Sequence, residues 1–253
     1  MTDLKERMLQ AHGGAQRWGE LARVMLSVSV GGLDFLSRFQ LNPLRDVEVT
    51  LAGDGPELTF SPYPRAGLSG GFSPHRVWLE DAAGQCVSER VLSAPIGQGL
   101  RRSLVWDELD VLAYAGLLLS EILQLPRLIA TVEAELEELP PLGFAGERWQ
   151  RLRLRYAESA PLSVSEHLLY LDGAGMIRRI DYASALYGAW FRVSQLWDGH
   201  ESVAGLVFPT RCSIHPCIAP GIPMRATALT WLEFSDINPI AAAYSDISGR
   251  PAV

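Results

Sequence analysis

Cysteine is scarce in this sequence, which has only three among its 253 residues, Cys86, Cys212 and Cys217. An odd and sparse set excludes a disulfide framework and is typical of a reducing compartment. The N-terminal stretch MTDLKERMLQAHGG lacks the apolar segment and the cleavage site of a signal peptide. No run reaches the roughly 18 apolar residues of a membrane-spanning helix. We therefore expect a cytoplasmic protein without stable membrane insertion.

Positive charge is also in short supply, because 22 lysines and arginines stand against 29 aspartates and glutamates. The formal net charge of −7 argues against nucleic acid or an anionic membrane as the main partner. The apolar content of 48% is typical of a globular protein long enough to bury a core. Because no repeat, low-complexity tract or long linker is present, we expect one domain over residues 1–253 with a tail over 236–253.

Motifs for catalysis and cofactor binding are missing as well. The sequence has no Gly-x-Ser-x-Gly nucleophile elbow, phosphate-binding loop or dinucleotide fingerprint. Gly67–Gly71 lacks the spacing of such motifs and is predicted to be a loop. Cys212 and Cys217 flank His215, but residues five apart on a strand point to opposite faces and cannot converge on zinc. We expect neither a metal nor a cofactor.

The sequence does contain a clear β-meander between His167 and His215. Short runs of aromatic and β-branched residues alternate with turn clusters at Asp172–Gly175, Ser184–Gly188 and Asp198–Gly205. The strands of this meander are apolar on both faces, whereas a sheet with one wet face alternates more cleanly. Each face must therefore be covered by a helix, by the curvature of the sheet or by a ligand.

Further strands are predicted from period-two alternation or from turns on either side. They cover residues 24–30, 34–41, 47–51, 58–60, 76–79, 86–92 and 226–234. Thr131–Leu139 fits a helix or a strand, but Arg151, Arg153 and Arg155 lie on an unambiguous strand. We interpret the two segments as a hairpin whose outer face pairs these arginines with Glu133, Glu135 and Glu137.

Two helices are predicted. A short one begins at Thr2 or Asp3 and ends near Ala11, before Gly13-Gly14. The longer one covers Asp107–Gln124, with Asp107 as N-cap and Pro126 beyond its end. Its stretch VLAYAGLLL carries no charge, so it lacks the polar face of a surface helix. We therefore expect this helix to be buried on more than one side.

Polar residues embedded among the aromatic residues of the meander form the best candidate site. Asp181 lies close in sequence to Arg178 and Arg179, and His167 lies on the preceding strand. A buried charge in an apolar wall must be paired, because leaving it unpaired is very costly. Three roles are open for this cluster: a structural salt bridge, orientation of a ligand's polar head, or acid/base catalysis.

Several segments resemble known proteins. The N-terminal Ala11-His12-Gly13-Gly14 with Trp18, and one apolar helix between strands, are similar to the LolA/LolB/LppX-like lipoprotein-carrier fold. Four further sets of residues resemble an uncharacterised bacterial family of that fold. They are Trp106-Asp107 with Tyr114-Ala-Gly116, Asp172–Gly175, Arg179–Tyr182 and Phe208–Arg211. The resemblance implies a mainly β (α+β) protein: a large curved antiparallel sheet, half-barrel-like, with an N-terminal helix and a buried apolar helix on its concave face.

Three functions follow as hypotheses. The first is non-enzymatic binding or carriage of an apolar or acylated small molecule between the sheet and the helix 107–124. The second is an enzyme that acts on a hydrophobic molecule in the same cavity, with His167 and Asp181 as acid/base pair. The third is a structural module without a ligand. The predicted ligand-binding residues are Trp78, Tyr114, Tyr170, Tyr182, Trp190, Trp197, His167 and Asp181.

Overall fold

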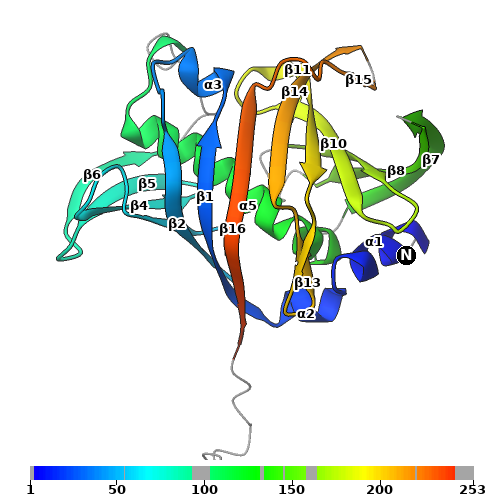
Figure 1. The fold of residues 1–253 in the computed structure, drawn as a ribbon, viewed down its shortest axis with the longest axis horizontal. Coiled ribbons are helices and arrows are strands. Elements are labelled where there is room, and N and C mark those ends of the chain that lie inside the picture. Colours follow the sequence, from blue (N-terminus) through cyan, green and yellow to red (C-terminus); the bar gives the residue numbers. More distant parts are fainter. Residues whose placement is uncertain are drawn as a thin grey trace, which may run out of the picture.

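A computed structural model describes residues 3–53, 55–92, 103–131, 134–144, 146–157, 164–219 and 221–242. Within these ranges the chain forms a 14-stranded sheet with antiparallel pairings, ordered β6-β5-β4-β3-β2-β1-β16-β14-β11-β10-β9-β8-β7, with β15 paired to β14 (Figure 1). The strands are β1 Leu21–Gly31, β2 Leu44–Ala52, β3 Leu58–Ser61, β4 Leu68–Ser73, β5 Arg76–Asp81, β6 Cys86–Val91, β7 Ala134–Phe144, β8 Glu147–Tyr156, β9 Glu166–Leu171, β10 Ile177–Ser184, β11 Gly188–Asp198, β14 Arg211–Ala219, β15 Ile222–Pro223 and β16 Thr230–Ala241.

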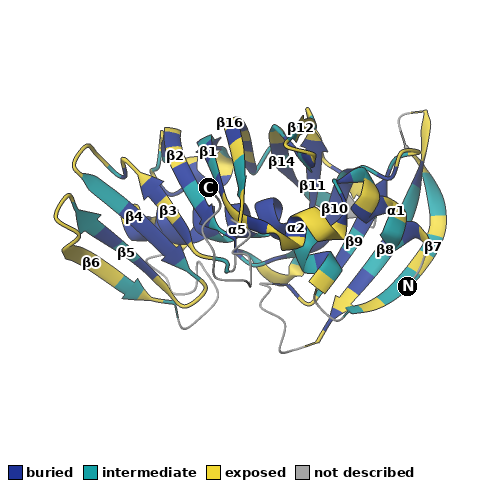
Figure 2. Ribbon diagram, turned by 90° about the horizontal axis from the view of Figure 1, so that it is seen from below, coloured by how far each residue is buried: buried dark blue, intermediate teal, exposed yellow. Residues whose placement is uncertain are grey.

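The first and last strands pair in the middle of the sheet, where Val28 of β1 lies opposite Phe234 of β16. The sheet is open and curved, and its strands form an arc around one long helix (Figure 2). The predicted mainly β architecture, a half-barrel with a helix on its concave face, is confirmed. A separate two-stranded sheet, β12 Glu201–Val203 and β13 Leu206–Phe208, lies near the N-terminal helices α1 Asp3–Ala11 and α2 Ala15–Gly19 (Figure 1).

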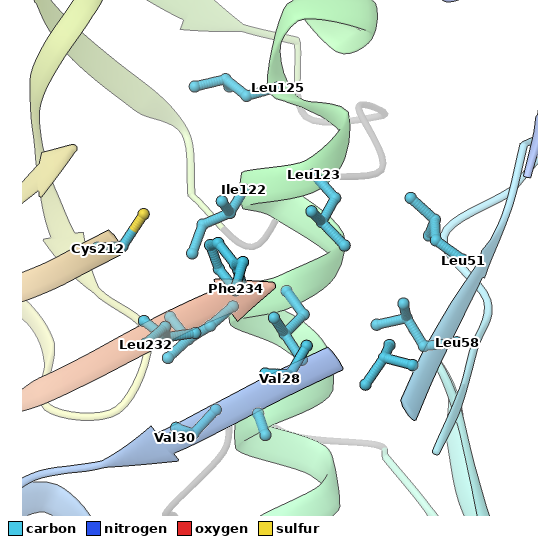
Figure 3. Close-up of a cluster of buried hydrophobic side chains, with 14 of the residues drawn as sticks. Val28, Val30, Leu51, Leu58, Ile122, Leu123, Leu125, Cys212, Leu232 and Phe234 are labelled. Atoms are coloured by element: carbon cyan, nitrogen blue, oxygen red, sulfur yellow. The ribbon is translucent and has the colours of Figure 1, made fainter. Parts of the chain in front are cut away.

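Alternation along the strands places the core on the concave side. Val24, Leu26, Val28 and Val30 of β1 are buried, as the period-two pattern predicts. Figure 3 shows how side chains from both halves of the sheet converge on the helix. On the helix, Ile122 lies on the side of Leu232 and Phe234, and Leu123 lies on the side of Leu51 and Leu58.

The long helix α5 covers Glu108–Thr131 and is buried on most sides, as predicted. Asp107 and Asp110 form a reciprocal cap at its start, each accepting a hydrogen bond from the other's backbone N–H at 3.3 and 3.0 Å. Close approach to β4 requires glycine, because a Cβ on Gly116 would lie 2.3 Å from the ring of Phe72. By length and composition α5 could cross a membrane, but 89% of its most apolar 18-residue stretch is buried within the fold.

The predicted end of this helix is wrong, because α5 continues through Pro126 to Thr131. Proline removes one backbone donor from a helix and usually bends or breaks it. Pro126 is itself buried, and so are its neighbours Leu125 and Ile129. Packing of the apolar face against the sheet thus outweighs the lost hydrogen bond.

Three further local predictions are corrected. Residues 34–41 form no strand but the short helix α3 Leu33–Leu36 and a turn, because Asp34 and Phe35 both point into the core. Of the predicted loop Gly67–Gly71, residues 68–71 belong to β4, whose glycines allow Leu112 of α5 and Trp78 to lie against the strand. The predicted tail over 236–253 begins too early, because β16 pairs with β1 as far as Ala241.

The predicted hairpin is formed by β7 and β8, and its charge ladder is present in part. Arg153 lies 2.6 Å from Glu137, and Arg155 lies 3.6 Å from Glu135. Glu166 of β9 extends the ladder, 3.3 Å from Arg155. Arg151 instead donates to the Pro140 carbonyl, and Glu133 is outside the described residues.

Candidate functional site

A small cavity lies between α5 and the strands β10, β11 and β14, on the concave side of the sheet. Its volume is about 10 Å³, which is room for one water molecule. Its apolar wall is made of Leu117, Leu118, Val193, Ile214 and Leu229 with Ala185, and its polar wall of Asp34, Tyr114, Glu121, Tyr182, Ser184 and Tyr187. A ligand-sized molecule therefore fits here only if α5 or its neighbours move.

Asp34 is the centre of a buried hydrogen-bond network at one end of this cavity. Its Oδ2 accepts from the hydroxyls of Tyr114 and Thr230, each at 2.8 Å. Its Oδ1 accepts a further hydrogen bond from the Tyr187 hydroxyl. Thr230 begins β16 and Tyr187 lies between β10 and β11, so one carboxylate ties α3, α5 and the sheet together.

The tyrosines of the cavity remain protonated donors. Burial, followed by the charge of Asp34, raises the pKa of Tyr114 well above its ordinary value. Burial also raises the pKa of Tyr182 well above the ordinary value, and its hydroxyl donates to Oε1 of Gln195 at 3.1 Å. These groups orient and hold other polar groups, and they do not exchange protons near neutral pH.

His167 also lies on the concave side, next to this cavity. Its Nδ1 is 2.9 Å from the Tyr156 hydroxyl, and its ring meets that of Tyr182 edge-on at a centroid distance of 5.6 Å. Burial lowers the pKa of His167 to about 3, so the imidazole is neutral at physiological pH. With a pKa this far from 7, it is a poor general base or acid.

Asp181 lies on the opposite, convex face of the sheet. Its carboxylate accepts hydrogen bonds from Nε and Nη2 of Arg179, each at 2.7 Å, and from the Tyr170 hydroxyl at 2.9 Å. Ser194 of β11 donates to it at 2.6 Å. Arg179 in turn donates to the Gly221 carbonyl of the β14–β15 turn, which covers the cluster.

His167 and Asp181 therefore do not form the predicted acid/base pair. On β9, His167 and Leu169 face the core beneath the sheet, and Tyr170 faces outwards to Asp181. Strand geometry alone places the two groups on different faces. The Asp181 cluster has the bonding of a structural salt bridge, the first of the three roles considered from the sequence.

The three predicted tryptophans are not at the cavity. Trp78 lies on the outer face over Gly71, and its indole N–H donates to Glu80 at 2.8 Å. Trp190 is 80% exposed at the start of β11. Trp197 is buried near the N-terminal helices, 6.5 Å from the ring of His12. Of the eight predicted ligand-binding residues, only Tyr114 and Tyr182 line the cavity.

The structure adds polar residues that the sequence analysis did not select. Asp34 lies in a segment predicted as a strand, and Tyr187 and Thr230 lie outside the predicted site. One signal was available, because Asp34 is the single acidic residue in the apolar stretch Gly31-Gly-Leu-Asp-Phe-Leu36. A lone carboxylate among apolar residues indicates either a turn or a buried, bonded group.

The cysteines occupy separate environments. Cys212 is part of the core under the sheet, whereas Cys217 has its Sγ 2.9 Å from the Ser194 hydroxyl on the outer face. The two therefore point to opposite faces, as strand geometry predicts. Within the described ranges, no group of three or more His, Cys, Asp or Glu side chains is placed to hold a metal ion.

The fold is shared with proteins of known structure. A LolA superfamily protein from Nitrosomonas europaea is 13% identical, with 93% of each chain covered and a TM-score of 0.51. A DUF1329 family protein from Desulfovibrio piger is 11% identical, with 94% of each chain covered and a TM-score of 0.52. This chain has the LolA-like fold. The sequence itself matches no protein-family model and no curated protein.

A third structure with the LolA-like fold is a domain assigned to outer membrane lipoprotein sorting in Vibrio parahaemolyticus. It is 11% identical and has a TM-score of 0.52, with 96% of this chain and 93% of that one covered. Across these three structures the shared feature is the arrangement of the chain, since the identities are low. The predicted resemblance to the lipoprotein-carrier fold is confirmed at the level of the fold.

Proposed function

We propose that this protein binds an apolar or acylated small molecule between α5 and the concave face of the sheet, without catalysing a reaction. The observation that carries the proposal is α5 itself, an apolar helix held inside an open, curved sheet with a small cavity along one side. A helix that is apolar all round can exchange its contacts with the sheet for contacts with a ligand of the same character.

The LolA-like fold supports this proposal. One of the three structures named above is assigned to the sorting of lipoproteins, which are acylated proteins. The same spatial arrangement here encloses Leu117, Leu118, Val193 and Ile214, which suit an acyl or other hydrocarbon chain. The polar residues of the cavity lie towards Asp34, so the polar end of the ligand would point that way.

Binding requires a movement of α5, because the cavity holds no more than one water molecule. The start of α5 is fixed by Arg90, which lies 2.7 Å from Asp107 and 2.6 Å from Asp110. Tyr114 is fixed by Asp34. We infer that the part of α5 beyond Tyr114, which carries Leu117 and Leu118, moves away from β10 and β11 when a ligand enters.

Native mass spectrometry of the protein purified from its own host tests this proposal directly. We expect a bound apolar molecule, and an environment-sensitive apolar dye should be displaced by fatty acids. Leu118→Ala widens the cavity and should strengthen dye binding, whereas the control Leu112→Ala removes a side chain that packs near Gly70. No co-purifying molecule together with no dye binding would leave the structural module as the better hypothesis.

The cytoplasmic location remains a prediction of the sequence.

A further inference from the structure

Exposed apolar side chains gather at one end of the half-barrel. The ends of β1, β10 and β14 and the starts of β2, β11 and β16 meet there, at the top of Figure 1, beside α3 and β15. Most large apolar residues that are exposed in the described ranges belong to this end. They form what we call the apolar rim: Leu33, Leu36, Phe39, Leu41, Leu104, Val105, Trp190, Ile222 and Met224.

Hydrogen bonds place two segments of the rim side by side. The Trp106 N–H donates to the Arg38 carbonyl at 3.3 Å, and Gln40 donates to the Trp106 carbonyl at 2.7 Å. Leu104 and Val105, which precede Trp106, therefore lie beside the turn that carries Phe39 and Leu41. Monomeric proteins rarely leave so many apolar side chains together in water unless the surface binds something.

A chain of ring contacts connects the turn after α3 to Trp190. The guanidinium of Arg38 lies 5.7 Å from the centre of the Tyr187 ring, and that ring packs on Phe191 at 4.8 Å. Phe191 contacts Trp190 at 5.3 Å. The 80% exposed indole of Trp190 thus sits at the edge of the rim, and tryptophan is enriched at membrane–water interfaces.

Phe39, at the tip of the rim, combines an unfavourable backbone conformation with an exposed aromatic side chain. Phe39 has a φ of +64°, a left-handed conformation that is uncommon for a bulky residue, and it is 77% exposed. Neither packing nor backbone preference explains a phenylalanine here. Strain of this kind is characteristic of functional surfaces.

The charge of the rim differs from that of the whole chain. Residues 32–45, 103–106, 185–192 and 221–229 contain four arginines, of which Arg45, Arg192 and Arg225 are exposed, and one acid, Asp34, which is buried. Four positive charges minus one give +3, against −7 for the whole chain. Carboxylates lie close to these ranges as well: Asp46 accepts a hydrogen bond from Ser29 Oγ at 3.2 Å, Asp107 lies 2.7 Å from Arg90, and Glu166 of β9 lies 3.7 Å from Arg192.

We propose that the apolar rim docks on a lipid bilayer that contains anionic lipids. Protruding apolar side chains can enter the headgroup region, and arginines beside them are attracted by the negative surface. A second copy of this chain fits less well, because docking rim on rim would bring the exposed arginines together. The net charge had argued against an anionic membrane, but a docking surface responds to its local charge.

A groove with both apolar and charged walls adjoins the rim. It has a volume of about 650 Å³ and runs between α3 and the outer surface of β1 and β16. Its wall contains the apolar side chains of Leu33, Leu36, Leu41 and Trp231 and the charged side chains of Arg45, Asp46 and Glu233. The cavity residues Asp34, Ser184 and Tyr187 belong to the same end of the molecule. The docking surface therefore lies at the same end of the molecule as the candidate ligand site. The observations that support docking do not depend on ligand binding.

Flotation with vesicles tests the docking surface. We expect the protein to float with phosphatidylcholine vesicles that contain phosphatidylglycerol, less so with pure phosphatidylcholine, and to be released by 0.5 M salt. The double variant Phe39→Ser, Leu41→Ser should lose at least tenfold in binding. The matched control is Val87→Ser, Val91→Ser, which removes two exposed apolar side chains from β6, far along the sheet. Arg45→Glu, Arg225→Glu should weaken binding to the anionic vesicles only.

Three outcomes would overturn the proposal. They are failure of the native protein to float with vesicles, an equal loss of vesicle binding in the rim and β6 variants, and a native protein that is dimeric in solution while the rim variant is monomeric. Circular dichroism and melting temperature verify that each variant is folded. A protein that floats but carries no apolar molecule in native mass spectrometry would contradict the proposed function and leave the docking surface in place.

Discussion

Asp34 of α3 and Tyr114 of α5 are joined across the core by a hydrogen bond of 2.8 Å, in which the Tyr114 hydroxyl donates to Asp34 Oδ2. This contact links the helix that fills the half-barrel to the end that carries the apolar rim. Both residues are buried, so the bond is made in a region of low dielectric constant, where it is stronger than in water.

Replacement of Tyr114 by Phe removes this donor and keeps the aromatic ring. A hydrogen bond to a charged group contributes about 1.5–3 kcal/mol, and we expect the free energy of unfolding in urea to fall by about that amount. If α5 moves when a ligand binds, Tyr114→Phe should also accelerate the uptake of an apolar dye.

Tyr187→Phe is the matched control for this prediction. Tyr187 donates to the other oxygen of Asp34 but belongs to the connection between β10 and β11. The Tyr187→Phe variant should be less stable than the native protein but should take up the dye no faster. Equal acceleration in both variants would show that the bond to α5 has no special part in ligand entry.

The sequence predicted the sheet well because its strands carry period-two patterns of apolar residues. Val24, Leu26, Val28 and Val30 alternate with Met25, Ser27 and Ser29, and the meander from His167 is divided by glycine-containing turns. The apolar run from Val111 to Leu119 likewise predicted a buried helix. These are local signals, and local patterning is what a single sequence displays most directly.

The site was predicted less well because it depends on contacts between distant segments. Asp34, Tyr114 and Thr230 are brought together from three separate parts of the chain. His167 and Asp181 lie on the neighbouring strands β9 and β10. Asp181 pairs with Leu168, the residue after His167, and successive side chains of a strand point to opposite faces, so His167 and Asp181 lie on opposite faces of the sheet. A pattern of residue types carries no information of this kind without the strand register.

The Asp181 cluster and the charge ladder of β8 should respond very differently to mutation. Asp181→Ala would leave the buried guanidinium of Arg179 without its partner, and breaking such a pair costs about 3–5 kcal/mol. Arg153→Ala removes one member of a partly exposed ladder, and its cost should be below about 1 kcal/mol. Urea denaturation of the two variants measures both values, and similar values would contradict the assignment of either cluster.

His12 and His167, whose pKa values are lowered by burial, predict a loss of stability in mild acid. Burial lowers the pKa of His12 to about 4, and its neutral ring donates from Nδ1 to the Met8 carbonyl at 2.8 Å. Below the unfolded value of 6.5 the unfolded chain binds the proton and the folded chain does not, so acid favours unfolding. The contribution of His12 is complete above pH 6.5 and is lost as the pH falls towards 4, by up to about 1.4 kcal/mol per pH unit.

The variant His12→Gln isolates this effect, because glutamine can make similar hydrogen bonds but does not titrate. Between pH 6.5 and 5 its free energy of unfolding should fall less steeply than that of the native protein. His75→Gln, which changes an exposed histidine between β4 and β5, is the control and should leave the slope unchanged. An unaltered slope in His12→Gln would mean that His12 does not cause the acid sensitivity.

The leucines of α5 should separate into two classes when each is changed to alanine. Leu112 and Leu119 are fully buried, and such changes in a packed core cost about 2–5 kcal/mol. Leu117 is only partly buried and lines the cavity, so fewer packed atoms lose their neighbours when it is shortened. Leu117→Ala should therefore cost clearly less stability than Leu112→Ala or Leu119→Ala, while changing the affinity for an apolar dye. If all three variants were equally destabilised and none altered dye binding, α5 would be ordinary core on every side, and ligand entry along Leu117 would have to be abandoned.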